Sequence, residues 1–193
     1  MNVIERLIND DYVEHMKYAT ERKDNEIFVS ELVLCKQRAE FNKRYYYMYQ
    51  PNNSALIGKL IHRGLELFLY AFNQVEYEKE FSKQLGDYIV RGRVDVITED
   101  EVIEIKTGMD HRDTKPSEHH LQQVRLYMWL TGKQKGRIVY VTYGKLAEYE
   151  VTDACSDDEV AYMIDNWLSP RYEWECDYCQ FKNLCPHRVE RKR

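Results

Sequence analysis

The stretch GRVDVITEDEVIEIKTG (92–108) predicts two short β-strands joined by a tight acidic turn. Side chains on a strand alternate between its two faces, so Glu104 and Lys106 point away from the isoleucines that flank them. If residues 99–100 form the tip of the turn, Asp95 lies directly opposite Glu104. The Cβ atoms of such opposed residues are about 5 Å apart, where like charges destabilise the pair. The hairpin therefore places two mutually repelling carboxylates on one face.

The other face of the hairpin is apolar, and we expect it to pack in the core through Val94, Val96, Ile103 and Ile105. Two facing carboxylates require a cation, and hard oxygen ligands suit Mg²⁺ or Mn²⁺. A metal ion so placed activates water and stabilises charge on a phosphodiester, and Lys106 is positioned to orient that water. The alternative is a surface hairpin whose Glu–Lys pair contributes less than about 1 kcal/mol.

The chain has 193 residues, of which 44% are hydrophobic, so we expect one folded domain over residues 1–193. No apolar run approaches the roughly 18 residues that cross a bilayer, and the charged first residues do not resemble a secretory signal. We therefore expect a cytoplasmic protein without a membrane span. The formal net charge of -5 gives no overall sign of a nucleic-acid-binding protein, although metal-binding carboxylates add to that negative total.

The expected elements are two helices, several strands, a helix, two strands and a helix, which predicts an α/β fold with a mixed central sheet flanked by helices. Helices are expected over residues 30–42, 54–72, 116–130 and 156–168. Strands are expected over residues 76–81, 87–97, 101–106, 137–144 and 146–152. The helix over 54–72 is apolar nearly all round, so we expect it to be buried, with Gly58 and Gly64 allowing close approach to the sheet.

A basic and aromatic segment, CKQRAEFNKRYYYMY (35–49), combines four tyrosines with the cations Lys36, Arg38, Lys43 and Arg44. Cationic and aromatic side chains together hold the phosphates and stack the bases of single strands. A solvated amphipathic helix explains the same pattern equally well. The segment alone leaves both interpretations open.

Two further pairs of polar residues share helical faces. His62 and Glu66 are four residues apart on the first long helix, and Gln123 and Tyr127 are four apart on a later one. Imidazole is a good ligand for Mn²⁺, while an amide and a phenol can position DNA or Lys106. Taken singly, each of these side chains is more common as a core or surface residue.

In order along the chain, these residues read H…D…ExK…QxxxY over residues 54–130, and this order resembles the RecB-like branch of the D…ExK nuclease superfamily. The resemblance implies a restriction-endonuclease-like core and divalent-metal-dependent cleavage of DNA. It implies metal ligands at His62, Asp95, Glu104 and the backbone carbonyl of Ile105. It implies catalytic residues at Asp95, Glu104, Lys106, Gln123 and Tyr127.

Within this resemblance, Lys106 orients the attacking water, and Gln123 and Tyr127 position the strand or the lysine. Glu66 is expected only beside the metal ligands, without a direct role. The cations of the basic segment, Arg38, Lys43 and Arg44, together with the nearby tyrosines, are expected to guide a single strand toward the site.

Five cysteines in an apparently cytosolic chain favour metal or redox chemistry over disulfides. Three of them form the compact set Cys176-x2-Cys179-x5-Cys185, and spacing alone does not choose Cys35 or Cys155 as the fourth ligand. Four thiolates suit either Zn²⁺ or an iron–sulfur cluster, and the one-plus-three split favours the cluster.

The same one-plus-three arrangement resembles the iron–sulfur staple of RecB-like nucleases, which selects Cys35 and leaves Cys155 as a free thiol. The resemblance favours [4Fe–4S] over [2Fe–2S]. Such a cluster would close a loop of about 140 residues and tie the two ends of the chain together, which should be strongly stabilising.

The motifs and the cysteines together resemble the CRISPR-associated RecB-like exonucleases, the fourth Cas family. This resemblance implies exonuclease activity on single-stranded DNA, often 5′ to 3′ and sometimes with endonuclease activity, that trims DNA before spacer acquisition alongside integrase proteins. Stand-alone and virus-encoded repair or recombination nucleases share the motifs. A non-catalytic DNA-binding protein with this fold and a zinc-stabilised binding module are the rival classes. The sequence leaves open whether the chain forms a homo-oligomer.

Overall fold

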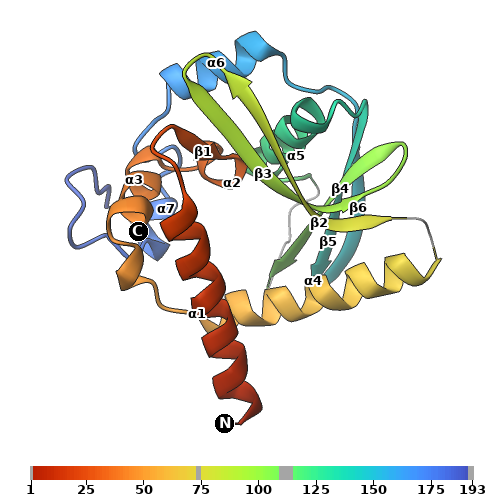
Figure 1. Cartoon of the computed structure of the whole chain (residues 1–193), viewed down its shortest axis with the longest axis horizontal. Coiled ribbons are helices and arrows are strands. Elements are labelled where there is room, and N and C mark those ends of the chain that lie inside the picture. The colour runs from red at the N-terminus through yellow and green to blue at the C-terminus, as the bar shows by residue number, and fades with distance from the viewer. Residues whose placement is uncertain (1, 73–74, 109–114, 191–193) are drawn as a thin grey trace.

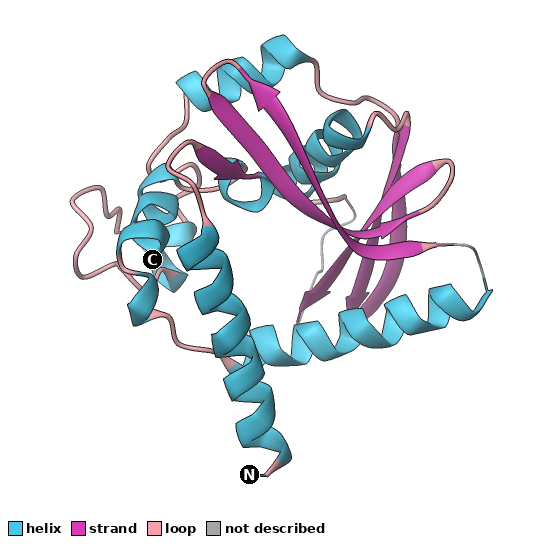
Figure 2. Cartoon of the chain, in the orientation of Figure 1, coloured by secondary structure: helices cyan, strands magenta, loops and turns pink. Residues whose placement is uncertain are grey.

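The computed structural model describes residues 2–72, 75–108 and 115–190 and shows a six-stranded mixed sheet flanked by helices (Figures 1 and 2). Its helices are α1 (Val3–Glu21), α2 (Val29–Leu32), α3 (Lys36–Arg44), the 3₁₀ turn η1 (Tyr46–Met48), α4 (Asn53–Phe72), α5 (Glu118–Thr131), α6 (Asp157–Asp165) and α7 (Glu175–Tyr178). Its strands are β1 (Glu26–Phe28), β2 (Glu76–Leu85), β3 (Tyr88–Ile97), β4 (Glu101–Gly108), β5 (Lys135–Thr142) and β6 (Lys145–Val151). None of the described helices is long and apolar enough to cross a membrane.

The sheet confirms the predicted α/β class and has an opening at its centre. The strand order is β1-β3-β4-β5-β6, with β2 paired to β3, and both parallel and antiparallel pairs occur. β2 runs along one edge of β3, so β1 and β4 share the other edge. β1 pairs with residues 89–91 and β4 with residues 96–97. Within the described sheet, residues 92–95 of β3 therefore lie between the two neighbours.

The acidic hairpin has the register that its sequence predicts, because Val96 pairs with Ile103. The paired ladder stops before Asp95, whose Oδ2 accepts the backbone N–H of Ile105 at 2.7 Å. The four apolar residues are buried, but the expectation that they share one face is wrong for Val94. Val94 packs in a different cluster from Val96 because β3 changes neighbours between them.

Two apolar clusters cover the two sides of the sheet. The larger one joins the sheet to α2, α5 and α6, and the smaller one joins it to α4, which runs below the strands in the view of Figure 1. α5 lies close to the strands because two positions beneath it lack side chains. A Cβ on Gly92 would lie 2.7 Å from a ring carbon of Tyr127, and one on Gly136 would overlap Val124 and Met128. The absence of side chains at these two glycines therefore allows α5 to pack close to the sheet.

The prediction that α4 is buried all round is wrong. Its inner side contributes Leu65 and Leu69 to the smaller cluster, but its outer side exposes Ile57, Leu60, Leu67 and Phe68 by 52–59%. Gly58 does approach the sheet, since a Cβ there would lie 2.8 Å from Oγ1 of Thr107. Gly64 does not, because a Cβ there would meet no atom within 4 Å. Only one side of this apolar helix thus packs against the described chain.

The helix expected over residues 30–42 is two helices, α2 and α3. The chain is extended at Cys35 (φ -63°, ψ 122°), and the Cys35 N–H donates to the Glu175 carboxylate at 2.8 Å. A partner 140 residues away therefore replaces the helical hydrogen bond. Other boundaries shift less: α5 begins two residues after Pro116 and stops at the left-handed Gly132, and α6 ends at Asp165, short of the expected 168.

Replacing Gly136 with Ala is expected to lower the free energy of unfolding by about 1–3 kcal/mol, because the added Cβ overlaps buried side chains of α5. Urea unfolding measures this loss. Gly64→Ala is the matched control: its methyl meets empty space and alanine favours helix, so stability should hold or rise by up to about 1 kcal/mol. Equal losses in both variants would contradict the close packing of α5 on β5.

Candidate active site

Asp95 and Glu104 lie at the opening in the sheet between β1 and β4. Glu104 is 4% exposed, and the Asp95 side chain is 14% exposed. Burial, followed by the negative charge of Asp95, raises the pKa of the Glu104 carboxyl well above its usual range. Among the described residues, no protein group forms a hydrogen bond with Oε2 of Glu104. The site therefore contains a buried carboxylate oxygen that has no such partner and is repelled by its neighbour.

The Asp95 carboxylate is contacted from two sides. Its Oδ2 accepts the N–H of Ile105 and lies 3.6 Å from Nδ1 of His62 on α4. Burial alone would lower the pKa of His62, but the hydrogen bond and charge of Asp95 raise it above its ordinary value. One turn later on α4, Glu66 is 1% exposed, and burial together with the charge of Glu78 raises its pKa. The structure thus brings the His62 imidazole, the Asp95 carboxylate and the Ile105 backbone together, with the buried Glu66 one turn further along α4.

Hydrogen bonds lead from Glu104 to α5. The Lys106 ammonium lies 2.7 Å from Oε1 of Glu104 and donates to Oε1 of Gln123, also at 2.7 Å. Gln123 in turn donates through Nε2 to the Tyr127 hydroxyl at 3.0 Å. Burial, and then the charges of the nearby carboxylates, raises the pKa of Tyr127. Lys106 is therefore held from two sides with its charge beside the acidic pair.

This donor set fits a divalent cation. Carboxylate oxygens suit Mg²⁺ and Mn²⁺. Oε2 of Glu104, which has no hydrogen-bond partner among the described residues, could coordinate such an ion. In the described residues, no three His, Cys, Asp or Glu side chains are grouped closely enough to hold a metal ion as they stand. Because His62 contacts Asp95 directly, the imidazole would have to turn for both side chains to bind one ion.

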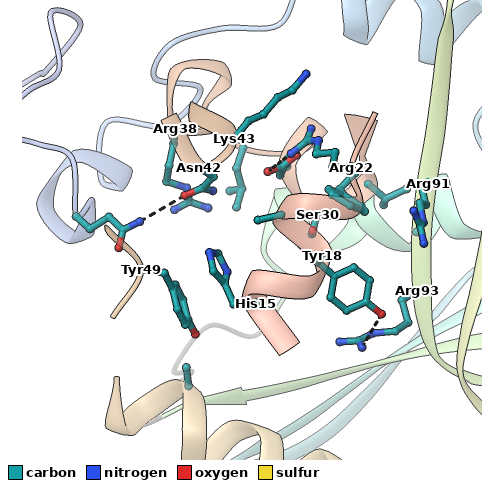
Figure 3. A pocket seen from close by; sticks show the side chains of 18 of the residues that line it. His15, Tyr18, Arg22, Ser30, Arg38, Asn42, Lys43, Tyr49, Arg91 and Arg93 are labelled. Carbon is teal, nitrogen blue, oxygen red and sulfur yellow. Dashed lines mark hydrogen bonds and ion pairs between the residues drawn. The ribbon is translucent and has the colours of Figure 1, made fainter. Parts of the chain in front are cut away.

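Asp95, Glu104 and the two α5 residues line one part of a cavity of about 1060 Å³. Other parts of its wall come from the end of α1, from α3 and from β3, and they carry the cations Arg22, Arg38, Lys43, Arg91 and Arg93 (Figure 3). His15 and Tyr49 also line it, with their rings stacked at 3.8 Å between centroids and 12° between planes. Basic and aromatic walls are the features that hold a single nucleic-acid strand.

Most cations of this cavity are already paired with carboxylates. Arg93, for example, lies 2.7 Å from Glu14 on α1. Arg38 differs, because it forms no ion pair with any residue that the structure describes. Arg44 is outside the cavity lining, exposed, with its guanidinium carbon 5.4 Å from the centre of the Tyr45 ring. Of the predicted guiding cations, Arg38 and Lys43 thus reach the cavity and Arg44 does not.

A second, small cavity is lined by Cys35, Cys176, Cys179 and Cys185. Cys155 lies apart in the larger apolar cluster, where Gln122 donates to its sulfur at 3.1 Å and burial raises the pKa of the thiol to about 11. Arg38, Lys182 and Arg188 line the same small cavity and would offset the negative charge of four thiolates. The four cysteines therefore surround one small cavity with cations beside it, and as they stand no three of these described thiols are grouped closely enough to hold a metal ion.

Some residues of the large cavity belong to no motif. Arg91 and Arg93 precede Asp95 at intervals of two on β3, and this spacing is a sequence signal that the three side chains share a strand face. His15 and Tyr18 come from α1, far away in the sequence, and no local pattern connects them with the hairpin. Only the folded chain brings them to the site.

Comparison with known proteins agrees with this geometry. The model of the PD-(D/E)XK nuclease superfamily matches residues 68–186. The CRISPR-associated exonuclease Cas4 of Saccharolobus solfataricus is 31% identical, covering 97% of this chain and 99% of its own length. The crystal structure of SSO0001 has a TM-score of 0.90 at 30% identity and covers 98% of this chain and 99% of that chain. An alkaline exonuclease from Laribacter hongkongensis shares the fold at a TM-score of 0.56 and 15% identity, with 88% of this chain and 98% of that chain covered.

The superfamily match includes the acidic hairpin, the polar face of α5 and the three C-terminal cysteines. Nucleases of this superfamily use divalent metal ions, which agrees with the oxygen-rich cluster around Asp95 and Glu104. The chain is therefore a nuclease, and it belongs to the PD-(D/E)XK nuclease superfamily and, within it, to the family of the CRISPR-associated exonuclease Cas4.

Proposed function

We propose that this nuclease is a metal-dependent exonuclease that degrades single-stranded DNA, in the 5′ to 3′ direction and with some endonuclease activity. The observation that carries the proposal is the pair of the partly buried Asp95 and the buried Glu104, with Lys106 fixed beside it, at the wall of a basic and aromatic cavity. Residues 1–193 act in it as one nuclease domain. A gel assay with labelled single strands, run with Mn²⁺ and with EDTA, tests the activity.

The metal ligands in this proposal are His62, Asp95, Glu104 and the carbonyl of Ile105. A Mg²⁺ or Mn²⁺ ion bound there would supply Lewis-acid stabilisation of phosphate charge and a more acidic water. Lys106 would orient the attacking water and offset the charge that develops on the phosphate. Its hydrogen bonds to the two flanking side chains fix the ammonium in place before substrate arrives.

The substrate strand would lie in the large cavity. Its backbone phosphates would contact Arg38 and Lys43, and a base would stack on the ring pair of Tyr49 and His15, which lines the cavity. Gln123 and Tyr127 line the cavity beside the acidic pair, so they would position the strand or Lys106 at the point of cleavage. Such a site would recognise the strand through its phosphates and through base stacking, which suits a nuclease without strict sequence preference.

The four cysteines around the small cavity would hold an iron–sulfur cluster, [4Fe–4S] rather than [2Fe–2S]. The cluster would tie α3 to the C-terminal segment and stabilise the wall that carries Arg38. A stabilising role needs no change of oxidation state. Cys155 would remain a free thiol.

The biological role we propose is the trimming of DNA before spacers enter a CRISPR array, alongside integrase proteins. The name of the relative from Saccharolobus solfataricus, which matches nearly the full length of the chain, favours this role over that of a stand-alone or virus-encoded nuclease.

Replacing Glu104 with Gln is expected to abolish Mn²⁺-dependent cleavage and to raise stability without metal at pH 8. Folding raises the pKa of this carboxyl above 4.5, so the wild-type protein loses stability as the pH rises from that value toward the folded pKa. The amide of the Glu104→Gln variant carries no charge and removes the repulsion by Asp95, so the free energy of unfolding without metal should rise by an amount on the order of 1 kcal/mol. Thermal melts with and without Mn²⁺ measure this stability, and Mn²⁺ should stabilise the wild type but not the variant.

Glu101→Gln is the matched control, because Glu101 lies on the same strand and pairs with Arg137 instead. It should cleave at the wild-type rate and keep its response to Mn²⁺. A Glu104→Gln variant that cleaves normally would refute the assignment of the metal site.

Replacing Arg38 with Ala is expected to weaken the binding of a labelled oligo-dT in EDTA. The slope of log K against log salt concentration should become shallower by about 0.7, the value for one phosphate contact on a single strand. Fluorescence anisotropy at several salt concentrations measures both. Arg44→Ala removes a cation of the same helix that lies outside the cavity, so it should change neither. Equal effects of the two substitutions would exclude the cavity as the strand path.

Replacing Cys185 with Ser is expected to remove the iron–sulfur absorbance at roughly 400 nm. Cys155→Ser should keep it, because this thiol lies in the apolar core instead. Absorbance spectra and iron content measure the difference. Bound zinc without such absorbance in the wild type would replace the cluster by a zinc site.

A further inference from the structure

A buried carboxylate organises the segment that precedes Cys176. Glu175 is 2% exposed and accepts three backbone hydrogen bonds, from Cys35 at 2.8 Å, Arg171 at 3.1 Å and Tyr172 at 2.9 Å. Bonds to an ionised acceptor are stronger than those between neutral groups. Glu175 therefore fixes the backbone on both sides of the cysteine cavity in one arrangement.

The segment that Glu175 holds carries two aromatic rings. Tyr172 and Trp174 stack at 5.9 Å between centroids with 15° between planes. His119, in the first turn of α5, lies against both rings, at 5.7 Å from Tyr172 and 5.2 Å from Trp174. Aromatic pairs in such geometry attract one another beyond the effect of their buried area. The three rings join the cysteine segment to α5.

α5 connects the ring stack to Lys106. His119 precedes Gln123 by four residues, so the two side chains share one face of the helix. Gln123 accepts the hydrogen bond that holds the Lys106 ammonium at 2.7 Å. A helix moves as a rigid element over one turn, so a displacement of its first turn displaces this amide.

We propose that the ring stack of His119, Tyr172 and Trp174 couples the folded cysteine segment to Lys106, and that His119 is a positioning residue for the nuclease reaction. The inference rests on the nuclease mechanism proposed above. When the cysteine segment is ordered, the stack fixes the start of α5 and Gln123 keeps Lys106 beside Glu104. When the segment loosens, the lysine loses one of its two partners. His119 is not part of the large cavity's lining, and we assign it a positioning role through Gln123 rather than a contact with substrate.

The imidazole acts here as an uncharged ring. Burial, and then the positive charges of Lys106 and Arg38, lowers the pKa of His119 to about 4. At neutral pH the ring is thus neutral, and a phenyl ring can replace it without changing the charge near the lysine. His119→Phe therefore keeps the stack, whereas His119→Ala removes it.

Single-turnover cleavage of a labelled single strand in Mn²⁺ tests the proposal. His119→Ala should keep the iron content and the affinity for oligo-dT but cleave about 10- to 100-fold more slowly, the cost of a small misplacement of a catalytic group. His119→Phe should recover the rate to within a few-fold of wild type. Tyr162→Ala, which removes an exposed ring on α6, is the matched control and should cleave normally.

A second measurement combines His119→Ala with Cys185→Ser. If the cysteine segment acts on Lys106 through the ring stack, Cys185→Ser alone should cleave more slowly than the wild type. In the His119→Ala background the same substitution should lower the cleavage rate little further. Fully additive losses would show that the two act separately and would overturn the proposal.

Three other outcomes also decide. A His119→Ala variant that cleaves at the wild-type rate, or a His119→Phe variant as slow as His119→Ala, would refute the ring stack as the link. Loss of iron in His119→Ala would make the ring a structural part of the cysteine segment and would refute it too. A wild-type protein that does not cleave in Mn²⁺ would instead refute the nuclease mechanism, which separates the two failures.

Discussion

The structure depends on the repulsion between two carboxylates, Glu104, which is buried, and Asp95, which is partly buried. Asp95 and Glu104 face each other where β1 and β4 leave an opening along β3, and neither can reach bulk water freely. Burial strengthens the repulsion, so the protein supplies a lysine on one side and leaves one carboxylate oxygen without a hydrogen-bond partner among the described residues. A pure folding unit would gain stability from apolar residues at these positions. A site that must attract a divalent ion gains from keeping the acids.

α5 connects the pair of Asp95 and Glu104 to the rest of the molecule. Gly92 and Gly136 let the helix lie close to the strands, and its polar side chains then reach into the opening. At its first turn the same helix meets the aromatic rings that precede Cys176. One helix thus contacts the apolar core, the acidic site and the cysteine segment, so the positions of all three are linked.

The sequence predicted what local chemistry dictates. The hairpin register followed from turn position and strand alternation, and the end of α5 and the start of α6 lie within one residue of the expected positions. It failed where a distant partner overrides local preference. The expected helix over 30–42 breaks at Cys35 because Glu175 takes its N–H. The apolar face of α4 stays exposed because hydrophobic residues indicate what can be buried and not what is available to cover them.

By itself the sequence determined the α/β class, the mixed sheet and the order of the candidate site residues, because side-chain periodicity and turn chemistry act over a few residues. The tertiary structure alone decided which groups meet: the walls of the large cavity from α1 and β3, and the rings that contact His119. These contacts join residues far apart in the chain. Their geometry follows from how the helices pack on the sheet, which no local pattern encodes.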